Sequence, residues 1–108
     1  MIYLCVPSEL ASELVTSGAA RQRPKPRGSI VELIVTGATG AATFVSLLQG
    51  PETVLRIARA FRAVALKRPD KRIEVHIKGP KGEVHLFDCD RDTPLEELAA
   101  LVKRDLLG

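Results

Sequence analysis

Histidine and aspartate are the residue types in this 108-residue chain whose spacing could suit a metal ion. His76 and His85 flank a turn, and pairing Lys78 with Glu83 across that turn makes the two imidazoles neighbours on adjacent strands. Glu74 then lies on the same face as a third ligand. The pattern is equally typical of a solvated pair of strands, and two imidazoles do not complete a site. We favour the solvated strands, and metal binding is the alternative.

Asp88, Asp90 and Asp92 alternate ahead of a predicted helix and form a second such arrangement. The glycine and the final glutamate of an EF-hand are missing, so negative charge near a helix N-terminus explains them better. No nucleophile is paired with either histidine at a spacing diagnostic of hydrolases. Cys5 and Cys89 belong to no metal or redox motif, and we expect both to be reduced. The sequence therefore predicts no enzyme activity, no metal and no cofactor.

A glycine-containing segment, Val35 to Thr43, superficially resembles the phosphate-binding turn of dinucleotide-binding folds. Its third glycine position is a threonine, and no strand ending in an acidic residue follows about 20 residues later. We expect its glycines to allow a tight turn with positive φ.

The distribution of charge says more than the net charge of +3. Residues 51–82 contain nine Lys and Arg against three acids, whereas residues 88–108 contain six acids against three bases. On the predicted helix in the basic segment, leucines fall within the same arc as arginines, and apolar residues among charges favour a protein interface. The residues we expect to contact a protein partner are Leu55, Arg56, Arg59, Arg62, Leu66 and Phe87. The basic helix meeting the acidic region of a second copy would give a homo-oligomer.

A basic, proline-rich loop is predicted at residues 21–29, where fixed proline φ angles and charge repulsion keep the chain extended. It supports an alternative function, nucleic-acid binding through phosphates. The residues that would contact phosphate are Arg21, Arg23, Lys25 and Arg27.

These residues must be positioned by one α+β domain spanning residues 1–108. Apolar periodicity predicts the order β-α-β-α-α-β-β-α, with a mixed sheet of about four strands and helices packed on it in two layers. The predicted elements are a strand at 2–6, a helix ending at Gly18, a strand at 30–36, helical segments at 41–48 and 52–67, a hairpin at 72–78 and 83–88, and a helix from Pro94 to about Leu107. Thr93 is the expected N-cap of that last helix.

The N-terminus shows no secretory signal pattern, so we expect a cytoplasmic protein. The uncharged run from Leu33 to Pro51 approaches the length of a membrane span. Its threonines and glycines favour a buried strand followed by a helix, and a membrane location is not expected.

Three segments resemble the effector-associated constant component family, small α+β proteins of bacterial conflict systems. They are Ile30 to Val35, the segment LRIARAF at 55–61, and the segment RIEVHIKGPKGEV at 72–84. The resemblance covers residues 30 to about 90. It implies a non-catalytic adaptor or scaffold of antiviral defence that works beside separately encoded effectors, and it carries over no catalytic residue.

Overall fold

The computed structural model describes residues 3–25, 28, 30–35, 37, 40–48, 50, 52–79, 82, 84–90 and 92–104. Among these residues it contains six strands and three helices. In chain order they are β1 (Tyr3–Pro7), α1 (Ser8–Thr16), β2 (Ala20–Arg23), β3 (Ile30–Val35), β4 (Ala42–Leu47), α2 (Thr53–Leu66), β5 (Arg72–Lys78), β6 (Val84–Asp90) and α3 (Leu95–Val102). The α+β class expected from the sequence is confirmed, with two strands more than expected.

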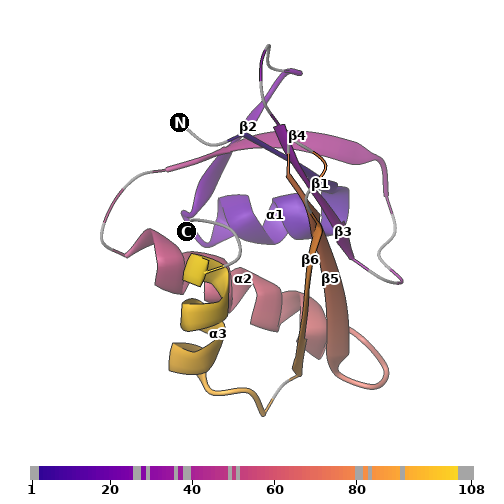
Figure 1. The fold of residues 1–108 in the computed structure, drawn as a ribbon, viewed down its shortest axis with the longest axis vertical. Coiled ribbons are helices and arrows are strands. Elements are labelled where there is room, and N and C mark those ends of the chain that lie inside the picture. Colours follow the sequence, from indigo (N-terminus) through magenta and orange to yellow (C-terminus); the bar gives the residue numbers. More distant parts are fainter. Residues whose placement is uncertain are drawn as a thin grey trace.

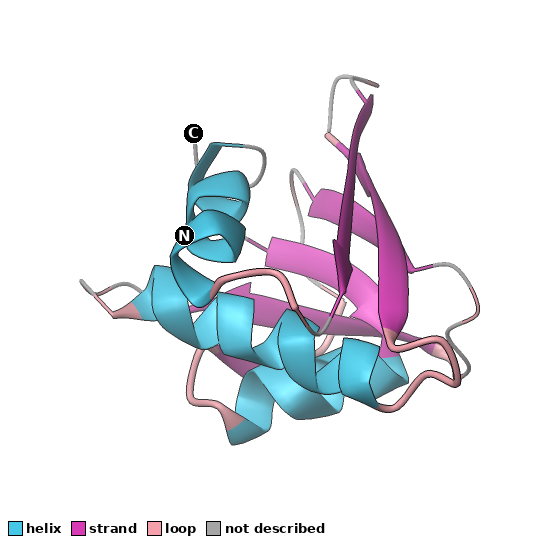
Figure 2. Ribbon diagram, turned by 90° about the horizontal axis from the view of Figure 1, so that it is seen from below, coloured by secondary structure: helices cyan, strands magenta, loops and turns pink. Residues whose placement is uncertain are grey.

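The strands form one mixed sheet in the order β2-β4-β1-β3-β5-β6. Only the β1–β3 pair is parallel, and the other four pairs are antiparallel. The helices gather on one side of the strands (Figures 1 and 2). We call the helix-covered side of the sheet the inner face and the opposite side the outer face.

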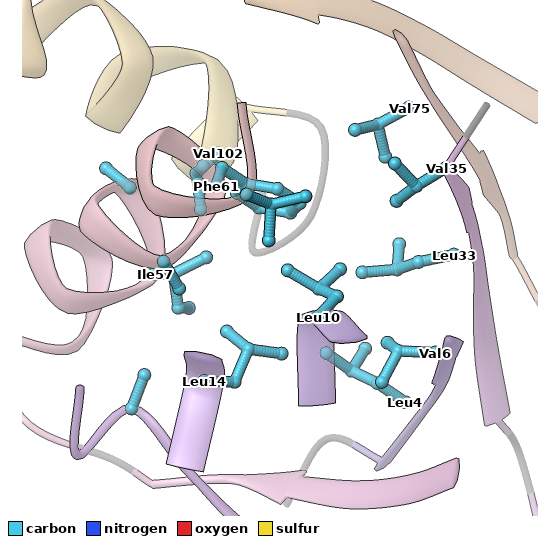
Figure 3. Packing of buried hydrophobic residues seen from close by; sticks show 14 of the residues in the cluster. Leu4, Val6, Leu10, Leu14, Leu33, Val35, Ile57, Phe61, Val75 and Val102 are labelled. Atoms are coloured by element: carbon cyan, nitrogen blue, oxygen red, sulfur yellow. The ribbon is translucent and has the colours of Figure 1, made fainter. Parts of the chain in front are cut away.

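The core lies between the inner face and the helices because strand and helix each bury one apolar side there. In β5 the buried residues Ile73, Val75 and Ile77 alternate with more exposed ones. Figure 3 shows side chains of β1, β3 and β5 pointing toward those of the helices. The helical contributors include Leu10, Leu14, Ile57, Phe61, Leu98 and Val102, each fully buried. Helix α2 packs against both α1 and α3.

Two predicted segments adopt a different structure. Ala42–Leu47 is strand β4 and not a helix, because it lies between β1 and β2 and pairs with both. Thr43, Phe44 and Val45 also belong to the residue types that favour strands. The expected basic loop at 21–29 begins as strand β2, which pairs with β4 as far as Arg23. Residues 26, 27 and 29 of that segment lie outside the described residues.

The predicted hairpin is present, but its predicted register is wrong by one residue. Lys78 pairs with Val84, so residues 79–83 separate the paired strands. His76 consequently lies opposite Leu86, and His85 lies opposite Ile77. Because side chains alternate between the faces of a strand, this shift places the two histidines on opposite faces of the sheet.

Helix α3 begins at Leu95, two residues after the threonine expected to cap it. Thr93 does not cap the helix: its hydroxyl accepts from the Asp90 N–H and donates to the Asp90 carboxylate, both at 3.1 Å. The first helical hydrogen bond instead runs from the Leu98 N–H to the Pro94 carbonyl at 3.0 Å. The predicted helix end, at residues 105–107, lies outside the described residues.

Candidate functional site: an exposed stripe on helix α2

Three residues lie along the solvent side of α2, between the flanks covered by α1 and α3. They are Leu55, Arg59 and Leu66, which we call the α2 stripe. The spacing of four and then seven residues keeps them within one narrow arc of a helix. Leu55 is 38% exposed and Leu66 is 51% exposed, and Arg59 between them is exposed. Of the residues expected to bind a partner, these three form an accessible set.

The two other arginines of α2 are used within the protein. Arg56 pairs with Glu52 at 3.1 Å and also reaches the Gly18 carbonyl at 3.4 Å, at the end of α1. Arg62 donates to the Thr93 carbonyl in the turn that precedes α3. The arginine nearest each neighbouring helix therefore anchors α2, and Arg59 is left with no ion-pair partner among the residues described.

Two ion pairs hold the end of α2 against α1. Arg68 pairs with Glu9 at 3.0 Å and donates to the Gly37 carbonyl at 2.8 Å. Lys67 pairs with Glu13, and this hydrogen bond raises the pKa of the Lys67 amine. In the sequence, Lys67 and Arg68 indicate only that a helix ends there. The spacing of four residues between the acids of α1 is the signal that could have revealed the contact.

The cations expected to bind phosphate lie elsewhere. In the β2–β4 register, Arg21 lies opposite Ser46 and Arg23 lies opposite Phe44, all on the outer face. The Arg23 side chain donates to the Ser46 hydroxyl at 3.3 Å. Lys25 is exposed just beyond β2, and Arg27 lies outside the described residues. The α2 stripe belongs to the helical layer, on the other side of the sheet. The two basic groups therefore do not form one continuous phosphate-binding surface.

Comparisons with family models, with curated proteins and with solved structures found no match to this chain. The function must therefore be argued from the arrangement of its own residues.

The candidate metal ligands are separated. His76 contacts Glu74 at 2.8 Å on the outer face, whereas His85 pairs with Ile77. No group of three metal-ligating side chains occurs among the described residues. Asp88 pairs with Arg72 at 3.4 Å, and the Asp90 carboxylate accepts from the Asp92 N–H at 2.9 Å.

The glycine-containing segment after β3 leads into a strand and not into a helix. Gly37 and Gly40 have φ angles of 79° and 105°, which confirms the turn with positive φ. Without a helix N-terminus after the turn, this segment lacks the amide cluster that binds phosphates in dinucleotide-binding folds.

Neither cysteine has the environment of a nucleophile. Cys5 and Cys89 are both free thiols. Burial raises the pKa of the Cys89 thiol to about 11, and burial also raises the pKa of Cys5. Nucleophilic cysteines need a lowered pKa, so both thiols are poorly suited to catalysis at neutral pH.

Phe87, the remaining residue expected to contact a partner, pairs with Val75 in the sheet register and not with Glu74. Its side chain lies outside what the structure describes. No helix in the described part of the chain is long and apolar enough to cross a membrane.

Proposed function

We propose that this protein is a non-enzymatic adaptor that binds a separately encoded protein through the α2 stripe. The resemblance noted in the sequence supports a role in a bacterial conflict system, and with it we propose a cytoplasmic location and an effector as partner. The observation that carries the proposal is the exposure of Leu55 and Leu66 on either side of Arg59.

The energetic case rests on the leucines. Burying an exposed leucine against a partner is favourable by about 1.5–3 kcal/mol for the full side chain, and part of this gain is available at each position. A central arginine adds a charged hydrogen-bond donor of the kind enriched at protein interfaces. The stripe lies on a helix held by ion pairs on the α1 side and by Arg62 on the α3 side. Because the surface is preorganised, little conformational entropy is lost on binding.

Nucleic-acid binding is a second candidate function, and one observation favours it. Arg21, Arg23 and Lys25 are all exposed within five residues at an edge of the sheet. Such a cluster can neutralise phosphates, and its affinity should fall steeply with salt.

One pair of variants separates the two functions. Arg59→Glu with Leu66→Ser changes the stripe, and Arg21→Glu with Val15→Ser makes a matched change of charge and apolar surface elsewhere. Val15 is 42% exposed on α1, so both variants should fold. Each tagged protein is used to capture partners from its host cells, followed by protein mass spectrometry and nuclease treatment.

The adaptor proposal predicts a stoichiometric protein that survives nuclease, is lost from the stripe variant and is kept by the control. If the stripe variant still captures this protein, the adaptor proposal is contradicted. Nuclease-sensitive material that is lost only from the Arg21 variant supports the nucleic-acid function instead.

A further inference from the structure

Strand β6 forms one edge of the sheet and has the features of an edge that pairs with a further strand. It spans seven residues and pairs only with β5 among the described residues (Figure 1). The backbone N–H and C=O groups along its other side therefore lack strand partners in that part of the chain. An unpaired edge of this length is a template for a further strand.

The opposite edge of the sheet is protected. Strand β2 has four residues, is followed immediately by Pro24, and exposes two arginines and a glutamine. Short length, proline and charge are the features with which proteins block edge-to-edge pairing. The chain thus blocks one edge of its sheet and leaves the other suited to pairing.

The outer-face residues of β6 divide into an apolar half and an acidic half. Val84 and Leu86 are 57% and 53% exposed, among the most exposed large hydrophobic side chains described. Asp88 and Asp90 follow them on the same face, and both are exposed. A partner strand that covers the apolar half and avoids the acidic half would match this pattern.

We propose that β6 pairs antiparallel with β6 of a second copy of this chain, about a two-fold axis at His85. In this register Val84 lies opposite the partner's Leu86, and Leu86 lies opposite the partner's Val84. The two most apolar exposed positions of the edge then cover each other on the outer face. Directly opposed apolar side chains are the pairs that stabilise antiparallel strands.

The charges select this register over its neighbours. A pairing centred at residue 86 or beyond sets the acids of both copies against apolar side chains or against one another, and opposed like charges are destabilising. Centring at His85 pairs Val84 to Leu86 of each copy, because β6 begins at Val84, and it carries Asp88 past the end of the partner strand. Asp88 also keeps its own cation, Arg72, at 3.4 Å.

The resulting assembly is closed. The two-fold pairing uses the β6 edge of both copies, and the edges that remain are two protected β2 strands. A dimer is therefore expected, in contrast to the open chain that pairing β6 with β2 of the next copy would give. The surface is separate from the α2 stripe, so this inference goes beyond the proposed adaptor function and does not rest on it.

The first test measures mass in solution by sedimentation equilibrium. The wild-type chain should approach twice its mass of 11.7 kDa as its concentration rises from micromolar to millimolar. Leu86→Lys should raise the dimer dissociation constant by about tenfold or more, since each copy loses an apolar contact. Leu66→Lys, the matched control at a leucine of similar exposure on α2, should leave it unchanged.

The second test measures register and is independent of the lysine variants. In a Cys5→Ser background, His85→Cys places two thiols directly opposite each other at the axis, within the range of a disulfide. Oxidation should crosslink His85→Cys rapidly and Val84→Cys or Leu86→Cys slowly. A monomeric wild type, a dimer lost with Leu66→Lys only, an open-ended series of oligomers, or equal crosslinking at the three positions would each overturn the proposal.

Discussion

At the residue scale, Cys89 couples folding to pH. The thiol is 2% exposed, and burial raises its pKa from 9.0 to about 11. The folded state thus favours the protonated thiol more strongly than the unfolded state does. The stability this contributes is complete below pH 9 and is lost as the pH rises toward about 11.

We expect the free energy of unfolding to fall by about 2–3 kcal/mol across this interval through Cys89 alone. Urea unfolding of the wild type and of Cys89→Ala at pH 8 and pH 10.5 measures the difference. The alanine variant should lack this part of the pH dependence, whatever its own stability. Parallel curves for the two proteins would contradict the assignment.

Gly40 gives a second prediction at the residue scale, because two constraints act there at once. Its φ angle is 105°, and a Cβ at this position would collide with the Ser8 hydroxyl. Gly37 has a φ of 79° but open space around a Cβ. Gly37→Ala should cost about 1–2 kcal/mol from backbone strain. Gly40→Ala should lower the free energy of unfolding by more than Gly37→Ala does. Thermal unfolding of both variants measures this difference. Equal losses of stability would show that the contact with Ser8 relaxes freely.

At the element scale, the contact between α1 and α2 depends on two ion pairs of different burial. The side chains of Arg68 and Glu9 are only 15% and 20% exposed, whereas that of Lys67 is 54% exposed. Removing one partner of a largely buried pair leaves an uncompensated charge, while exposed pairs contribute little.

We therefore expect Arg68→Met to lower the free energy of unfolding by about 2–4 kcal/mol, and Lys67→Met to have a much smaller effect. Adding Glu9→Gln to Arg68→Met should recover part of the loss, because the stranded carboxylate is removed. Chemical denaturation of the wild type, of Arg68→Met, of Glu9→Gln and of the double variant tests the coupling between the two side chains. Additive losses would mean that Arg68 acts through Gly37 alone.

Elements were predictable where their own periodicity matched their burial. Helix α2 lies at Thr53–Leu66 within the predicted 52–67, and β5 spans the predicted 72–78. Strand β4 was missed although Thr43, Phe44 and Val45 favour a strand, because so short a run has no periodicity that separates a strand from a helix. Strand β2 was missed because the charge of its arginines suggests a loop, although an edge strand tolerates it.

At the scale of the whole molecule, the protein has two separate candidate surfaces. The α2 stripe lies in the helical layer, and β6 lies at one end of the sheet. Helix α2 contacts β6, but the stripe lies on the solvent side of the helix, whereas Val84 and Leu86 lie on the outer face of the sheet. We expect surfaces that share no residue to act independently. Leu66→Lys should therefore weaken capture of the protein partner without changing self-association, and Leu86→Lys should do the reverse.

The double variant checks this independence. Leu66→Lys with Leu86→Lys should lose both activities, with each loss equal to that of the single variant in binding and sedimentation measurements. A single variant that removes both activities would indicate one shared surface and would contradict the separation.

The sequence by itself determined the α+β class, the apolar sides of most elements and the glycine turn after β3. These depend on residue periodicity and on local backbone freedom, which residues close in the sequence determine. The basic character of α2 and the exposure of Leu55 and Leu66 were predictable for the same reason.

Only the tertiary structure decided the strand order, the hairpin register and the roles of the individual arginines. Strand order joins segments distant in sequence, and a shift of one residue in register moved His85 away from the face of His76. Arg56, Arg59 and Arg62 look alike along the helix, yet the turns before β2 and α3 accept hydrogen bonds from two of them. Of these three arginines only Arg59 is exposed, and no ion-pair partner for it occurs among the described residues.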